Sequence, residues 1–162
     1  MKRPESSATV WGQDDGTFSP QRKAEIGILQ CLVSSASKAR RNLISSAANG
    51  VGWETIVCAS ADIALCEVKR NRVQLAMVDL VDRGETPQGA RELVQTLVQD
   101  SAEILVGVCG HEASPEEEIW ARQLGVWLYL PGVSTSSEVA MLCEHAMQVV
   151  AARRVGEAKS AS

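Results

Sequence analysis

The chain of 162 residues is long enough for one domain with a well-buried core and leaves little room for a second. Apolar residues make up 45% and charged residues 22%, which excludes disordered, collagen-like and membrane-embedded classes. The formal charge of -4 offers no general attraction for phosphate backbones, so nucleic acid is not an expected partner. No membrane partner is expected, because no window approaches the roughly 20 apolar residues of a spanning helix, and the expected location is the cytoplasm.

The two ends of the chain are expected to lie outside the folded domain. Residues 1–23 mix Ser, Pro, Gly and charges without periodicity and predict a flexible leader. Its aromatic residues, Trp11 and Phe18, could pack back on the domain, dock on a partner, or be incidental hydrophobic residues in a mobile arm. Residues 155–162 are small and polar and predict a disordered tail, which leaves residues 24–154 as the expected domain.

Short apolar runs alternate five times with amphipathic helical stretches. The runs, each expected to form a strand, cover residues 26–33, 54–59, 73–80, 104–109 and 126–130. Alternation of this kind predicts a parallel sheet with helices on both faces, a three-layer α/β sandwich. Function in such sheets gathers at the carboxyl ends of the strands.

The boundaries of the last two helices are marked by their flanking residues. Ser114 is expected as an N-cap, with Pro115 at the first helical position, Glu117 completing a capping box, and Gly125 as the stop signal. The final helix is expected over residues 136–153.

Four segments, at residues 33–40, 59–65, 75–80 and 124–130, follow one another in an order and spacing that resemble the receiver domain of bacterial response regulators. The run Leu75-Ala76-Met77-Val78-Asp79-Leu80 looks like the family's third strand, which ends in the phospho-accepting aspartate. The last segment looks like the entry to the fifth strand, with Tyr129 at the aromatic switch position. The resemblance implies a flavodoxin-like (βα)5 fold, sheet order 2-1-3-4-5, and a role in two-component signalling.

The resemblance also implies that the phosphorylation pocket is degenerate. Receivers carry an acidic pair that holds Mg²⁺, a lysine after the fifth strand, and a hydroxyl after the fourth. Here Ser34 and Ser35 replace the acids, Gly132 stands in place of the lysine, and Cys109, or Gly110, replaces the hydroxyl. Only Asp79 remains, so we expect no Mg²⁺, no metal site, no catalytic residue and little or no phosphotransfer.

The leading interpretation is therefore a pseudo-receiver that acts through contacts with a signalling protein and is not an enzyme. In the resembled family the last helices and strand form the partner and dimerisation face, on which Trp120, Trp127 and Tyr129 fall, so a homodimer is possible. One alternative is a genuine phosphorelay receiver that is phosphorylated slowly on Asp79. Another is a flavodoxin-like domain that binds a small molecule between Ser34, Asp79 and His111.

Histidine and cysteine residues receive simpler interpretations. His111 could act as a base or phosphoacceptor, but a loop histidine is the preferred interpretation, because no nucleophile with an orienting acid accompanies it in sequence. The cysteines lack C-x-x-C spacing and are expected as buried thiols, with Cys109 as a small packing residue. They are Cys31, Cys58, Cys66, Cys109 and Cys143.

Overall fold

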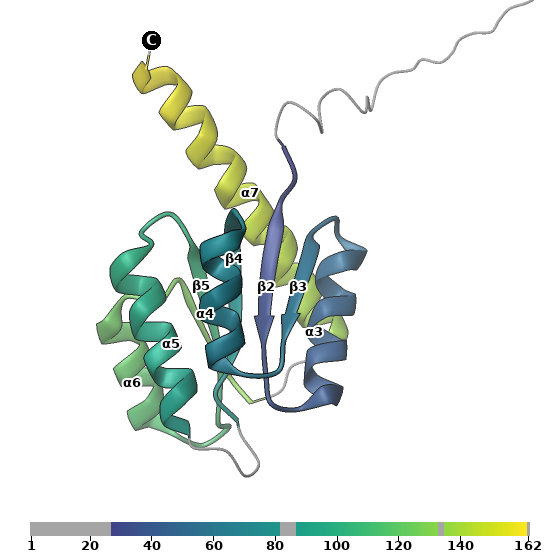
Figure 1. Cartoon of the computed structure of the whole chain (residues 1–162), viewed down its shortest axis with the longest axis vertical. Helices are drawn as coiled ribbons and strands as arrows, with labels where there is room; N and C mark the ends of the chain where they lie inside the picture. Colours follow the sequence, from purple (N-terminus) through teal and green to yellow (C-terminus); the bar gives the residue numbers. More distant parts are fainter. Residues whose placement is uncertain (1–26, 82–86, 133–134, 162) are drawn as a thin grey trace, which may run out of the picture.

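The computed structural model describes residues 27–81, 87–132 and 135–161 (Figure 1). Strands and helices alternate along this part of the chain. The strands are β2 (Gln30–Ser34), β3 (Glu54–Cys58), β4 (Val73–Asp79), β5 (Leu105–Gly110) and β6 (Leu128–Pro131). The helices are α3 (Lys38–Gly50), α4 (Ala61–Arg70), α5 (Pro87–Asp100), α6 (Pro115–Leu124) and α7 (Ser136–Ala161).

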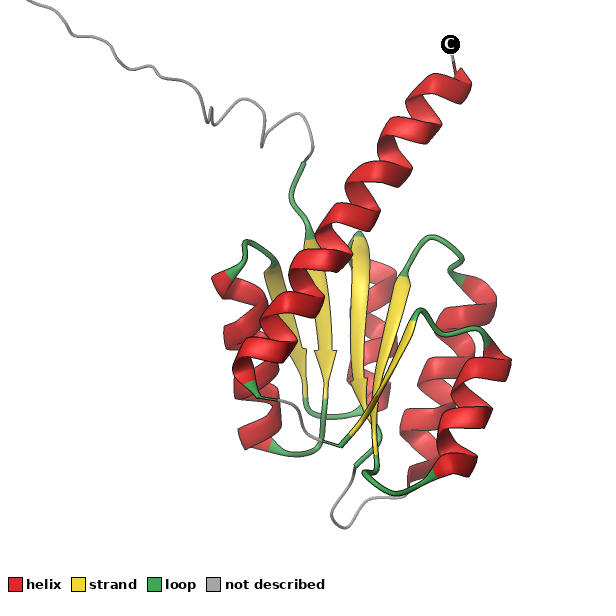
Figure 2. Ribbon diagram, turned by 180° about the vertical axis from the view of Figure 1, so that it is seen from behind, coloured by secondary structure: helices red, strands yellow, loops and turns green. Residues whose placement is uncertain are grey.

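The five strands form one parallel sheet in the order β3-β2-β4-β5-β6. Counted along the chain this order is 2-1-3-4-5, so the predicted fold class is confirmed. Helices α3 and α7 cover one face of the sheet, and α4, α5 and α6 cover the other (Figures 1 and 2). The carboxyl ends of all five strands therefore meet at one edge, where the predicted pocket residues Ser34, Asp79 and Cys109 lie.

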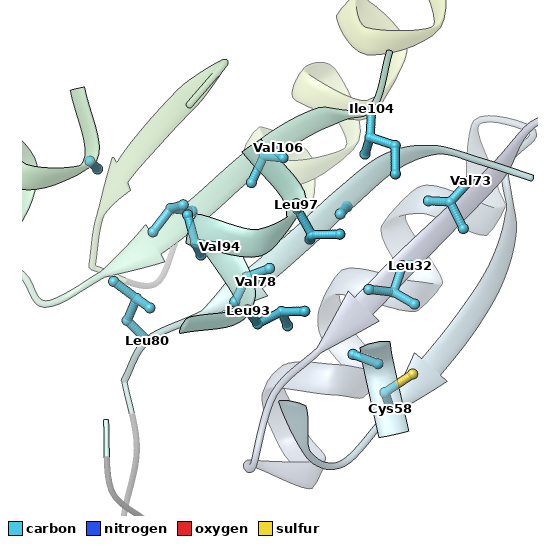
Figure 3. Close-up of a cluster of buried hydrophobic side chains, with 14 of the residues drawn as sticks. Leu32, Cys58, Val73, Val78, Leu80, Leu93, Val94, Leu97, Ile104 and Val106 are labelled. Atoms are coloured by element: carbon cyan, nitrogen blue, oxygen red, sulfur yellow. The ribbon is translucent and has the colours of Figure 1, made fainter. Parts of the chain in front are cut away.

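Strand β4 is buried on both faces and divides the core into two clusters. Leu75 and Met77 point toward α3 and α7, whereas Ala76 and Val78 point toward α4 and α5. Figure 3 shows the second of these clusters, in which side chains of α5 pack on the middle of the sheet. Burial of a Leu or Val side chain contributes roughly 1.5–3 kcal/mol, so the near-continuous apolar strand accounts for the central position of β4.

The predicted boundaries of α6 are confirmed. The Ser114 side chain accepts a hydrogen bond from the Glu117 amide, and Pro115 is the first helical residue. Gly125 ends the helix at φ 100°, a left-handed conformation that glycine adopts without steric cost.

Three predictions, about one strand, one helix and one cysteine, need correction. Strand β2 begins at Gln30, after Gly27 at φ 83°, and not at residue 26, which lies outside the described residues. The predicted end of the last helix at residue 153 is wrong, because α7 continues to Ala161 through exposed Gly156. Residues 155–161, expected as a disordered tail, therefore belong to this helix, where neighbouring alanines offset the weak helix propensity of one glycine.

Cys66 is the third correction, because it is exposed on α4, while the other four cysteines are buried as expected. It lies two positions after buried Ala64, on the opposite side of the helix. The predicted leader, residues 1–23, lies outside the described residues. Within those described, no helix is both long enough and apolar enough to cross a bilayer.

Candidate functional site

Asp79 is the last residue of β4, and its carboxylate is bound by an arginine from a different element. Arg40 donates from Nε to Asp79 Oδ2 at 2.6 Å and from Nη2 to Oδ1 at 3.0 Å. The Asp79 side chain is completely buried, and that of Arg40 is 16% exposed. The two side chains form a bidentate, charge-assisted pair at the carboxyl edge of the sheet.

Two further donors complete the surroundings of the Asp79 carboxylate. The Ser35 hydroxyl donates to Oδ2 at 2.7 Å, and the Val81 amide donates to Oδ1 at 3.0 Å. Each carboxylate oxygen therefore accepts two hydrogen bonds. The bond from Val81 ties the start of the following loop to the end of the strand, and the bond from Ser35 joins β4 to the end of β2.

The position of Arg40 follows from the start of helix α3. Ser37 is the N-cap, and its hydroxyl accepts a hydrogen bond from the Arg40 amide at 3.3 Å. Arg40 therefore stands in the first helical turn, directly after the end of β2, where its side chain reaches the neighbouring end of β4. Arg41 lies beside it and donates to the Ser35 carbonyl at 2.8 Å.

Sequence reasoning missed Arg40, although it lies in one of the segments that carry the resemblance. The available signal was a basic residue in the first turn of a helix that begins at the carboxyl edge of the sheet. Helix N-termini favour anions, so a cation there needs a carboxylate partner, and Asp79 is the buried one within reach.

The structure brings together most, but not all, of the predicted pocket residues. Ser35 contacts Asp79 directly, Ser34 is buried at the end of β2, and Cys109 is the register partner of Asp79 on β5. Gly132 is not part of the lining of the cavity beside Asp79, and a side chain at this position would meet Glu112. Its φ of 81° also disfavours a lysine there.

Cys109 is an unreactive thiol in this environment. It is 5% exposed, and burial, followed by the negative charge of Asp79, raises its pKa to about 12. A thiol must ionise to act as a nucleophile or metal ligand, so the side chain serves for packing between the strand ends.

The residues around Asp79 do not fit a magnesium ion. Mg²⁺ is held in proteins by carboxylates and water in near-octahedral geometry, and here the Asp79 carboxylate already accepts four hydrogen bonds, two of them from a guanidinium. A dication in this place would also face the positive charge of Arg40. Ser34 and Ser35 add only neutral hydroxyls.

A small cavity of about 310 Å³ lies beside Asp79, between the carboxyl ends of β2, β3 and β4 and the first turns of α4 and α5. Its lining is composed of Ser34, Ser35, Ala36, Ala59, Ser60, Ala61, Asp62, Asp79, Gly89 and Ala90. Two of the three residues expected for small-molecule binding, Ser34 and Asp79, belong to this lining. His111 does not, so the structure does not assemble the predicted trio.

A second buried carboxylate, Glu117, lies in the first turn of α6 and is 3% exposed. It accepts from the His111 amide at 2.6 Å and from the Tyr129 hydroxyl at 3.0 Å, and it lies 3.1 Å from His111 Nδ1. Arg91 Nη2 donates to it at 3.3 Å. Burial raises the pKa of Glu117, but the hydrogen bonds from His111 and Tyr129 outweigh this effect and hold the pKa below its ordinary value.

The Glu117 cluster corrects two predictions. Glu117 does not close a capping box on Ser114, because its carboxylate reaches past the N-cap to the His111 amide. His111 does have an orienting acid, which sequence spacing failed to show. The His111 side chain is 46% exposed, and we find no nucleophile among the described residues that bond to it.

Tyr129 is not part of an exposed aromatic face. It is 5% exposed, and its hydroxyl points inward to Glu117 past Gly110, where a side chain would collide with the tyrosine. Burial and the bond to Glu117 raise the pKa of Tyr129 to about 12. Trp127 and Trp120 are half-buried; Trp127 lies 5.7 Å from the His145 ring, and the Arg91 guanidinium lies 4.8 Å from the Trp120 ring.

Comparison with known proteins gives a clear result for the fold. No protein-family model and no curated protein sequence matches the chain. Among solved structures, NtrX from Brucella abortus matches with a TM-score of 0.71 at 18% identity, covering 80% of this chain and 29% of NtrX. A CheY-like receiver domain protein from Methanospirillum hungatei gives 0.62 at 14% identity, covering 75% and 98%.

HP1043, an orphan response regulator of H. pylori, matches with a TM-score of 0.61 at 19% identity, covering 75% of this chain and 96% of that protein. The chain has the fold of response-regulator receiver domains. Asp79 stands at the end of the third strand of this receiver fold, and the Arg40 pair occupies the edge at which the resemblance placed the phosphorylation pocket.

Proposed function

We propose that the chain is a pseudo-receiver, a signalling module that acts through contacts with another protein and does not transfer phosphoryl groups through Asp79. The observation that supports this proposal is the bidentate pair between Arg40 and Asp79. A receiver fold with this pair keeps its architecture and lacks a free nucleophile.

Phosphoryl transfer to Asp79 requires one carboxylate oxygen to form a bond to phosphorus while the leaving group departs. Both oxygens are engaged by the Arg40 guanidinium, and Oδ2 also accepts from Ser35. An attacking oxygen would have to give up charge-assisted bonds in a buried site before any metal could neutralise the incoming group. Loss of one preorganised electrostatic donor typically lowers a rate about 100-fold to 1,000-fold, and this pocket lacks several.

The resemblance places the partner on the surface formed by α6, β6 and α7. In this chain the surface carries Trp120 and Trp127, both half-buried, together with Ile119 and Met141, which are 55% and 69% exposed. Aromatic side chains are enriched at binding hot spots. A protein partner, or a second copy of the chain, fits these side chains better than a charged ligand does.

The test is incubation of the full chain with acetyl phosphate and Mg²⁺, followed by intact-mass measurement. We expect no phosphoryl adduct on the wild type or on Asp79→Asn, while a receiver domain with a complete pocket, run in parallel, becomes labelled. An adduct on the wild type that Asp79→Asn abolishes would establish a phosphorelay receiver and overturn the proposal.

Arg40→Ser provides the matched variant, because it removes the guanidinium and leaves Asp79 and its hydroxyl neighbour in place. We expect weak labelling of Asp79 in this variant if the ion pair is the main obstacle. Addition of Ser35→Asp, which supplies a second carboxylate for Mg²⁺, should increase labelling further.

A further inference from the structure

A groove of about 530 Å³ lies at the opposite end of the sheet, beside the amino ends of the strands. Its apolar lining is formed by Val68, Val73, Ile104 and Val150, the last three of them at most 9% exposed. The remaining lining residues are polar: Asn71, Arg72, Gln74, Ser101, Glu103, Arg153, Arg154 and Glu157. The groove thus combines an apolar floor with a charged rim.

The rim of this groove is basic, although the chain as a whole is acidic. Three arginines, Arg72, Arg153 and Arg154, stand against two carboxylates, Glu103 and Glu157, in a chain whose formal charge is -4. Arg153 donates to the Glu103 carbonyl at 3.2 Å. Among the described residues, no carboxylate forms an ion pair with any of the three guanidinium groups.

The described part of the chain begins at this groove. Gly27 lies next to Arg154, since a side chain at Gly27 would start 3.8 Å from Arg154 Nη1. Figures 1 and 2 show the start of β2 and the projecting turns of α7 at the same end of the sheet. The preceding residues therefore join the domain at the rim of the groove.

Those preceding residues contain a segment whose composition matches the groove. Between Glu5 and Arg22 the sequence has no Lys or Arg, and its only charges are Asp14 and Asp15. Trp11 and Phe18 flank this acidic pair. Aromatic rings suit the apolar floor, and the two carboxylates suit the arginines of the rim.

We propose that the segment Trp11–Phe18 of the same chain docks in this groove. Nine residue steps separate Phe18 from Gly27, and an extended chain covers about 30 Å in that number, so the segment can reach along the groove. Tethering also favours the intramolecular complex, because a short linker gives an effective concentration of the order of millimolar. The arginines of the rim then bind the two aspartates, and the valines and the isoleucine of the floor pack against one or both aromatic rings.

The test is amide hydrogen exchange of the full chain, read by mass spectrometry on peptides that cover residues 8–20. We expect exchange about tenfold slower than in a free peptide of the same sequence at low salt, with less protection at high salt. Exchange at the rate of the free peptide would overturn the proposal. Protection that depends on protein concentration would also overturn it, because the segment would then bind a second copy.

Charge reversals on both sides of the contact provide the specific controls. Asp14→Lys with Asp15→Lys, or Arg72→Glu with Arg153→Glu, should abolish the protection, and the four substitutions combined should restore it at least in part. Lys38→Glu with Arg122→Glu changes the charge by the same amount on exposed residues outside the groove lining, and should leave the protection unchanged. Equal loss in this control, or no loss in the groove variant, would contradict docking at this site.

Discussion

Two buried carboxylates lie near the same edge of the sheet, and the structure compensates them in different ways. Asp79 is paired with Arg40, whose side chain is 16% exposed, so its negative charge is neutralised by a positive charge inside the protein. Glu117 is held chiefly by the His111 amide and the Tyr129 hydroxyl, and its charged neighbour Arg91 is 39% exposed. A buried acid can therefore be stabilised by a full ion pair or, for an acid in the first turn of a helix, by neutral donors from neighbouring elements.

The difference between the two sites has chemical consequences. At Asp79 the guanidinium occupies the oxygens that a reaction would need, so the ion pair removes reactivity. At Glu117 the hydrogen bonds fix the orientation of Tyr129 and of the His111 ring, and no described cation fully covers the carboxylate. At Asp79 the ion pair blocks access to the carboxylate oxygens, whereas at Glu117 the hydrogen bonds hold Tyr129 in one buried position.

Arg40→Met should have the largest effect on stability, because it leaves the buried Asp79 charge without its cation. Loss of one partner from a buried pair typically costs about 3–5 kcal/mol. Asp79→Asn should cost less, because Arg40 is partly exposed and can turn toward solvent. Urea unfolding of both single variants and the double variant measures these free energies as a double-mutant cycle.

The double variant decides how the cycle is interpreted. If Arg40 and Asp79 mainly neutralise each other's charge, the double variant Arg40→Met with Asp79→Asn should be more stable than Arg40→Met alone. A cost below about 1 kcal/mol for Arg40→Met would instead place this pair with weak surface ion pairs.

Gly110→Ala tests the second site, with an expected loss of about 1–3 kcal/mol through overpacking. The added methyl group would collide with the Tyr129 hydroxyl and the Glu117 carboxylate. Gly50→Ala is the matched control, because apart from its chain neighbours and the backbone of its own helix no atom lies within 4 Å of the new methyl group, and alanine favours the helix. Tyr129 is the only tyrosine of the chain, so its tyrosinate absorbance reports the same change independently.

Titration of Tyr129 shows whether a loss of stability in Gly110→Ala comes from expulsion of the tyrosine ring. Burial and Glu117 raise the pKa of Tyr129 to about 12, so expulsion of the ring by Gly110→Ala should lower the pKa toward about 10. A variant that loses stability without this change in pKa would show that Tyr129 stays buried, and that the methyl group is accommodated elsewhere.

Glu117→Gln should have a smaller effect that depends on pH. The pKa of Glu117 is lowered in the folded state, so its ionised form contributes stability above the unfolded value of about 4.3, and this contribution is lost as the pH falls through that value and the lower folded one. At neutral pH we expect the variant to be about 1–3 kcal/mol less stable than the wild type. The difference should shrink below about pH 4, as measured by chemical unfolding across that range.

Glu116→Gln is the control for this titration, since Glu116 is exposed and stands in the same helical turn. It shares the favourable position near the helix N-terminus and lacks the buried hydrogen bonds. An equal loss of acid dependence in both variants would assign the effect to the helix dipole alone.

The fold could be predicted from the sequence because its signals are local and repeated. The apolar run of β4, the Ser114 cap and the Gly125 stop each act within a few residues, and their alternation determines the order of layers. The end of α7 could not be predicted in this way. Gly156 indicates a helix end, whereas the residues around it favour continued helix, and the local sequence does not decide between the two.

The candidate site was predicted only in part, because its decisive contacts join distant positions. Asp79, Ser35 and Cys109 follow from strand ends that must meet at one edge. The pairing of Arg40 with Asp79 spans 39 residues, and a local pattern does not specify which carboxylate a helical arginine will reach. The inward turn of Tyr129 likewise depends on Gly110 and Glu117, which lie on two other elements.

Thiol labelling should show the smallest effect. It tests whether the Arg40 pair closes the Asp79 site locally. Burial raises the pKa of Cys109 to about 12 and that of Cys143 to about 11, so both should react slowly in the folded protein, whereas exposed Cys66 reacts first. In a Cys66→Ser background, Arg40→Met should speed the labelling of Cys109 more than that of Cys143, because the weakened site opens locally beside Asp79. Mass spectrometry of the labelled peptides gives the ratio of the two rates. Equal acceleration of both thiols would mean that the whole domain opens as one unit, and the Arg40 pair would then stabilise the fold without closing the site on its own.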